Sequence, residues 1–186
     1  MTTTDESLLH LVLDLLGSRY YGKYRGTVDG NADDTGRGRL KVRVKGIVDD
    51  PIWAMPCVPY AGKGVGMVAL PEPGTGVWVE FEGGDPSFPI WTGFFWGDGE
   101  APEKADPKVK IWKTEKTTLR LDDGNDKILA ETSGKARVEL GQDVVSEAGK
   151  AKHTVGAKGV VSEQGKGKVE VTTAAVVVNS GAMEVA

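Results

Sequence analysis

Apolar and polar residues alternate strongly in the first half of the chain. The alternation is clearest in residues 39–46 and 76–82, and a period of two is typical of a strand with one buried face. Further strands are expected at 20–29, 53–60, 66–70 and in the aromatic run 88–96. Residues 83–86 read Gly-Gly-Asp-Pro, which is turn chemistry between two of these strands. Five or six short strands within so few residues predict a small closed barrel, and we expect an OB fold rather than an SH3-like barrel.

Residues 3–17 predict a short helix that precedes the barrel. Thr3 and Glu6 fit a capping box, and Gly17 fits a helix stop. Leucine and valine cover nearly all sides of this helix, so it requires burial. It can pack on the barrel that follows or dock a partner. A membrane anchor is disfavoured, because a span needs about 18–20 apolar residues.

Aromatic residues and prolines divide the chain at about residue 100. The chain has nine prolines, all at or before Pro107, and after Pro107 its only aromatic residue is Trp112. Residues 98–107 are rich in glycine, proline and charge, as is typical of a linker. We therefore expect an N-terminal helical segment at 1–19, a barrel at 20–97, a linker at 98–107 and a needle at 108–186.

The needle sequence contains short alternating stretches rich in valine, separated by glycines without a strict repeat. One buried valine contributes only about 1.5–2 kcal/mol, whereas ordering costs roughly 1–2 kcal/mol per residue. The needle is therefore either disordered or built from several chains that wind together and pair their strands. Its valine, threonine and alternation favour winding around a three-fold axis. The residues expected in the shared core are Val138, Leu140, Val155, Val160, Val169, Val171, Val176 and Val178.

Charge and cysteine content narrow the class of protein. The net charge is -4, which disfavours a general nucleic-acid binder. Cys57 is the single cysteine, so no disulfide within the chain is expected. The start of the chain lacks the basic segment of a secretory signal, and we expect assembly in the cytoplasm without a signal peptide.

No group of residues is arranged for catalysis, and we expect no catalytic, cofactor-binding or metal site. Residues 62–66 have the wrong spacing for a phosphate-binding loop. The paired aspartates, such as Asp33 and Asp34, sit beside turn residues and are better explained as solvated loops. His153 has two explanations. It faces solvent between Lys152 and Thr154, or three copies meet at the axis of a trimer and bind an ion.

Motifs in the barrel region resemble a known family. The sequence reads GTVD at 26–29, GRLKVRV at 38–44, PEPGTGVWVEFEGGDP at 71–86 and PIWTG at 89–93, with Trp53 between them. In this order they resemble the OB domain of the central spike proteins of contractile injection systems. That group includes phage baseplate assembly protein V, the T4-type spike and VgrG of type VI secretion. The match covers about residues 20–97, and the needle is similar to the family's triple-stranded β-helix in composition.

The resemblance implies a homotrimeric, non-enzymatic spike located in a phage or injection-particle baseplate. It implies an all-β fold after the short N-terminal helix: an OB-fold barrel, then an intertwined β-helix. No hub domain precedes the barrel, so the hub is expected as a separate protein contacted through Leu8, Leu9, Val12 and Leu16. The linker is too short for the lysozyme domain of the T4-type spike. The chain also lacks the His-x-His tip of some short spikes, and a PAAR-type tip protein is expected to contact Met183, Val185 and Ala186.

The expected function is therefore a structural spike that caps the tail tube under the hub and pierces the target envelope when the sheath contracts. The alternative is an OB-fold module that binds single-stranded nucleic acid or saccharide. It would use Arg39, Lys41, Arg43 and Lys45 as cations, with Trp91 and Trp96 as stacking platforms. A solvated outer face of the sheet explains the same four cations without a ligand.

Overall fold

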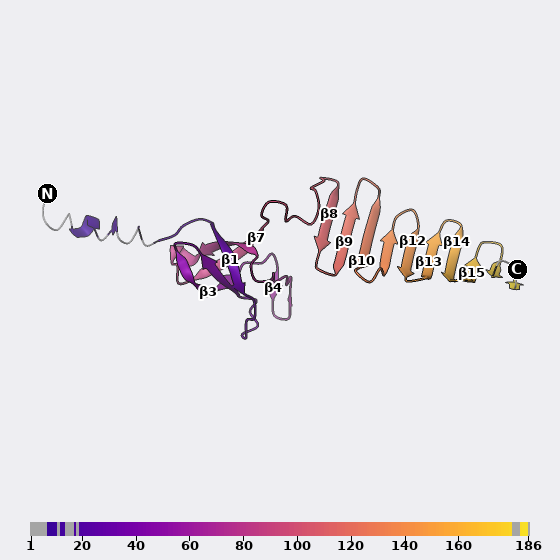
Figure 1. Cartoon of the computed structure of the whole chain (residues 1–186), viewed down its shortest axis with the longest axis horizontal. Coiled ribbons are helices and arrows are strands. Elements are labelled where there is room, and N and C mark those ends of the chain that lie inside the picture. Colours follow the sequence, from indigo (N-terminus) through magenta and orange to yellow (C-terminus); the bar gives the residue numbers. More distant parts are fainter. Residues whose placement is uncertain (1–6, 11, 14–16, 18, 180–182, 186) are drawn as a thin grey trace. The chain divides into compact units, whose positions relative to one another are not determined.

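The computed structural model describes residues 7–10, 12–13, 17, 19–179 and 183–185. The chain forms two compact units, Met1–Glu100 and Ala101–Ala186, and each is described here by itself. The first contains a β-barrel and the second a long antiparallel sheet (Figure 1). The expected all-β fold is confirmed.

The barrel closes in the order β1-β2-β3-β7-β6. All neighbouring strands are antiparallel except β3 and β7, which are parallel and pair Met55 with Ile90. This is the connectivity of an OB fold, so the OB barrel predicted from the alternation is confirmed. The bounds are β1 (Tyr24–Gly30), β2 (Leu40–Val44), β3 (Val48–Pro56), β6 (Gly76–Phe81) and β7 (Pro89–Phe95).

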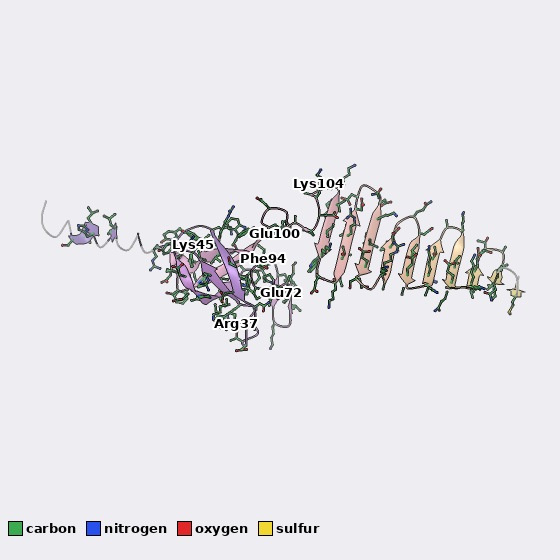
Figure 2. All side chains as sticks on the ribbon, viewed as in Figure 1. Arg37, Lys45, Glu72, Phe94, Glu100 and Lys104 are labelled. Carbon is green, nitrogen blue, oxygen red and sulfur yellow. The ribbon has the colours of Figure 1, made fainter. Side chains whose placement is uncertain are left out.

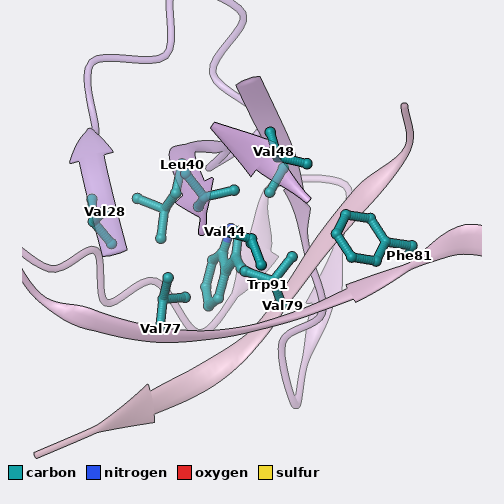
Figure 3. Packing of buried hydrophobic residues seen from close by; sticks show 10 residues of the cluster. Val28, Leu40, Val44, Val48, Val77, Val79, Phe81 and Trp91 are labelled. Atoms are coloured by element: carbon teal, nitrogen blue, oxygen red, sulfur yellow. The ribbon is translucent and has the colours of Figure 1, made fainter. Parts of the chain in front are cut away.

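The core of the barrel consists of the inward-facing residues of these strands (Figure 3). Trp91 is also buried, and its indole Nε1 donates a hydrogen bond of 3.1 Å to the carbonyl oxygen of Gly38. The other members are Val28, Leu40, Val42, Val44, Val48, Ala54, Val77, Val79 and Phe81. Alternation in the sequence therefore places a continuous apolar interior inside the closed sheet.

The turn after β6 follows the local sequence. The expected turn after β6 includes the 3₁₀ segment η1 (Glu82–Gly84), where Gly83 and Gly84 have φ of 58° and 77°, a region that favours glycine. Asp85 then accepts a hydrogen bond from the backbone N–H of Ser87. The expected strand at 66–70 is wrong. Only the short hairpin of β4 (Ala61–Gly62) and β5 (Val65–Gly66) forms there.

The expected N-terminal helix is only partly described. Residues 7–10, 12, 13 and 17 are helical, and those with described side chains are exposed. Packing of this helix on the barrel is therefore not observed for these residues.

The second unit is a ten-stranded sheet in which each strand pairs with the one before it and the one after it. The expectation that strands pair between chains is wrong for the described strands, because their hydrogen bonds run within one chain. The bounds are β8 (Val109–Lys113), β9 (Thr117–Asp122), β10 (Lys127–Thr132), β11 (Arg137–Leu140), β12 (Val144–Ala148), β13 (Ala151–Gly156), β14 (Gly159–Gln164), β15 (Gly167–Val171), β16 (Val176–Val178) and β17 (Met183–Val185).

Candidate functional site: the two faces of the C-terminal sheet

One face of the ten-stranded sheet, called here the apolar face, carries two rows of residues that run across the strands. Cross-strand partners lie on the same face, so the register of the strands defines each row. The first row is Leu121, Ile128, Leu140, Val144, Val155, Val160, Val171 and Val176. The second row is Trp112, Leu119, Ala130, Val138, Ser146, His153, Ser162, Val169, Val178 and Met183.

This apolar face is uncovered in the single chain. Ten of its leucine, isoleucine and valine side chains are between 37% and 43% exposed, whereas Val160 and Val178 are half-buried. Among the described residues, no hydrophobic side chain beyond Trp91 is buried. Figure 2 shows side chains standing on both sides of the sheet with no second layer of this unit against either side. The C-terminal unit therefore has no core of its own, and a contiguous apolar surface of this kind is typical of an interface.

The eight residues expected in a shared core all lie on the apolar face. Val155, Val160, Val171, Val176 and Leu140 are in the first row, and the other three, Val138, Val169 and Val178, are in the second. A hollow of about 1330 Å³ follows the second row. Its lining includes Trp112, Leu119, Val138, His153, Val169 and Val178.

His153 lies on the apolar face and not on the charged one. Its partners in the second row are Ser146 in β12 and Ser162 in β14. Nδ1 of the imidazole is 2.8 Å from Oγ of Ser162. The His153 side chain is exposed in the single chain, and it lies on the same surface as the valines.

The opposite face carries charges of alternating sign in register. We call this row the charge ladder, and it crosses six strands from β10 to β15. Glu147 accepts a salt bridge of 2.7 Å from Arg137 and lies 3.4 Å from the ammonium of Lys152. The ladder consists of Glu131, Arg137, Glu147, Lys152, Glu163 and Lys168.

These contacts shift the ionisation of the ladder residues. The hydrogen bond from Arg137 lowers the pKa of Glu147, and the same contact raises the pKa of Arg137. A neighbouring pair acts in the same way, because Lys127 lowers the pKa of Glu139. The charged face therefore favours one register, since a slip of one residue would turn these charges towards the valines.

The sheet also contains a repeat that the sequence analysis missed. The tetrad Val-Val-Ser-Glu occurs at 144–147 and again 16 residues later at 160–163. Each tetrad is followed by a turn glycine, Gly149 with φ of 61° and Gly165 with φ of 59°. One strand, a turn and the returning strand form this hairpin repeat. The irregular spacing of the glycines hid it, although the two identical tetrads were a visible signal.

Two of the four cations in the basic strand of the barrel have acidic partners. The Arg39 guanidinium makes a 2.7 Å salt bridge to Asp33 and lies 5.1 Å from the ring centroid of Trp53. The Asp33 side chain is only 3% exposed, and its hydrogen bonds to Arg39 hold the pKa of this carboxyl well below its usual range. Arg43 is likewise paired with Asp29 at 3.0 Å. Lys41 and Lys45 make no ion pair within the described residues.

The two tryptophans expected as stacking platforms are not brought together as exposed rings. Trp91 is 4% exposed and belongs to the barrel core, so its ring is not available to a base or sugar. Trp96 is 69% exposed and follows the end of β7. The structure therefore does not assemble the binding surface of the alternative function from these residues.

The residues expected at the two ends of the chain are only partly described. Leu8, Leu9 and Val12 are helical and exposed, whereas Leu16 lies outside the described residues. Met183 is 60% exposed in β17, and Val185 pairs in register with Val176. Ala186 also lies outside the described residues.

The described part of the chain contains neither a metal-binding cluster nor a membrane-spanning helix. It contains no cluster of three or more histidine, cysteine, aspartate or glutamate side chains that could hold a metal ion within one chain. No helix there is both long enough and apolar enough to cross a membrane.

Comparison with known proteins identifies the barrel. The family model of the type VI secretion system/phage-baseplate injector OB domain matches residues 24–96, from the first residue of β1 to the residue after β7. No curated protein matches the chain. The family is a structural one, and its members assemble with other components of a virion or injection system. Residues 24–96 of this chain, which form its barrel, therefore match the injector OB-domain family of type VI secretion systems and phage baseplates.

Proposed function

We propose that this chain is the central spike of a contractile injection system, working as a homotrimer that pierces the target envelope. The observation that carries the proposal is the uncovered apolar face of residues 109–185. A sheet with no buried hydrophobic side chain needs a second surface to exclude water from its valines. Three copies packed by this face around an axis would bury both rows and leave the charge ladders outside.

The baseplate assignment of the barrel supports this arrangement. A spike requires a domain that joins the baseplate and a stiff extension beyond it. In this chain the extension would draw its stiffness from continuous hydrogen bonding within each sheet and from the shared apolar interior. The proposed task is mechanical, so it needs no catalytic residue.

Two contacts complete the proposal. The exposed Leu8, Leu9 and Val12, together with Leu16, would contact a separate hub protein at the end of the tail tube. Met183, Val185 and Ala186 would contact a tip protein of the PAAR type. Both contacts are testable by copurification, with Leu8→Asp and Leu9→Asp against the hub and Met183→Asp against the tip. Retention of either partner by its charged variant would contradict that contact.

Native mass measurement of the purified full chain tests the trimer. We expect a mass of three chains, and a truncation ending at Pro107 that keeps a folded barrel but dissociates readily. Circular dichroism checks the fold of the truncated barrel. A full chain that stays monomeric at working concentrations, or a truncation that is an equally robust trimer, would contradict the proposal.

An oligonucleotide-binding measurement separates this proposal from the alternative. A salt-sensitive shift on single-stranded DNA would favour a binding module, because phosphate contacts weaken as salt rises. We expect no shift, since Arg39 and Arg43 already have acidic partners and Trp91 is buried.

A further inference from the structure

The second row of the apolar face is interrupted at one place. Ser146, His153 and Ser162 are consecutive cross-strand neighbours, with Val138 before them and Val169 after them. In the hairpin repeat, His153 stands where Val169 stands 16 residues later. Along the described strands β8–β17, the only other titratable side chain on this face is Lys110, which lies in β8, the first strand of the sheet.

One nitrogen of the His153 ring is fixed by the protein. Nδ1 is 2.8 Å from the hydroxyl oxygen of Ser162, which can accept a hydrogen bond from Nδ1–H. In that tautomer Nε2 carries the lone pair. Nε2 makes no hydrogen bond within the described residues. A histidine whose other nitrogen donates to a protein oxygen is typical of a metal ligand.

In a three-fold trimer, the Nε2 atom of His153 needs a partner that its own chain does not supply. This step rests on the proposed trimer, in which the apolar faces enclose three copies of His153 at one level. In the Nδ1–H tautomer all three Nε2 atoms are acceptors, so they cannot satisfy one another. Buried polar atoms in native proteins have partners. A cation on the axis would satisfy all three lone pairs at once.

We propose that the trimer holds one divalent transition-metal ion on its axis, bound by Nε2 of His153 from each of the three chains. Imidazole nitrogen is a usual ligand of zinc, iron, nickel and copper, at about 2.0–2.1 Å for zinc. The site is incomplete in one chain, which fits the absence of a metal cluster within the described residues. The ion would fasten the three sheets at β13, between the ends of the needle.

Metal analysis of the full-length protein tests the proposal. The protein is stripped with a chelator, reloaded with Zn²⁺ alone, and measured by native mass and by elemental analysis of the same sample. We expect one zinc per three chains. Loading with Co²⁺ instead should give visible absorption bands from the nitrogen-bound ion.

Substitutions locate the ion. His153→Val replaces the ring with the residue found at the equivalent position, so we expect a trimer that binds no zinc. His10→Ala is the matched control, because His10 is the only other histidine, and it should retain the full zinc content. Ser162→Ala removes the group that orients the ring and should weaken zinc affinity by about 10–100-fold.

The outcomes separate this site from the proposed function. A chain that never forms a trimer would overturn the proposed function and this site with it. A trimer that takes up no zinc, that holds an anion at this level, or that keeps its zinc after His153→Val would overturn the metal site and leave the spike intact.

Discussion

Asp33 organises the loop between β1 and β2 through a set of hydrogen bonds. Its carboxylate accepts from Thr35 Oγ1 at 2.7 Å and from the backbone N–H of Arg37 at 3.0 Å. It also accepts from the backbone and the guanidinium of Arg39, which lies over Trp53. The sequence predicted a solvated acidic pair here. This was wrong for Asp33, because its partners become neighbours only when the loop folds back.

Asp33→Asn should destabilise the barrel at pH 7. The amide cannot accept on both atoms, so donors from the loop and Arg39 lose a partner. The pKa of Asp33 is lowered on folding, so its contribution is present above the unfolded pKa of about 3.9 and is lost as pH falls further. We expect a melting temperature several degrees below wild type at pH 7, and a gap that narrows below about pH 4. Asp34→Asn, at an exposed neighbour, is the control. Equal melting temperatures for the two variants would refute this role.

At the scale of elements, the clarity of alternation decided what the sequence could predict. Barrel strands such as β2 and β6 alternate large apolar with charged residues, and they were predicted within a few residues. Strands β12, β13 and β14 are harder to recognise from the sequence, because serine, alanine, glutamine and His153 occupy part of their apolar face. The contrast between their two faces is therefore weak, although their register follows the same rows.

Glu147→Lys tests the charge ladder as the element that sets the register. The substitution places three positive charges in adjacent positions, with Arg137 and Lys152 on either side. Like charges directly opposite one another destabilise a sheet. We expect a lower melting temperature for the C-terminal sheet, partly restored by salt, which screens exposed charges. Glu115→Lys, in the exposed turn between β8 and β9, should have no such effect. Should the two variants melt alike, the ladder does not select the register.

At the scale of the whole molecule, the pairing of strands could not be predicted from the sequence. Pairing between chains and pairing within one chain satisfy the same backbone groups and expose the same alternating faces. The two were distinguished only by short turns such as Gly149 and Gly165, which return each strand beside the previous one. The eight residues expected in a shared core could still be assigned to one face of the sheet, because parity along each strand does not depend on which chain supplies the partner strand.

The hairpin repeat makes the length of the sheet adjustable. Deletion of residues 160–175 joins Gly159 to Val176 and lets β16 replace β14 with the same face inward. We expect a folded trimer shortened by two strand spacings, about 10 Å, in electron micrographs. Deletion of residues 160–167 is the matched control. It turns Lys168 and Glu170 towards the apolar face and Val169 away from it, so this variant should not assemble. Assembly of both variants would show that the trimer does not depend on which side chains lie on the apolar face.

Pairing within one chain also bears on how the particle is made. Each antiparallel strand can join its predecessor as it leaves the ribosome, since no hydrogen bond of the described sheet waits for another polypeptide. Sister subunits would then meet as finished, flat surfaces and need not be threaded through one another. A spike built this way has no topological entanglement, and it could be taken apart and rebuilt without unfolding.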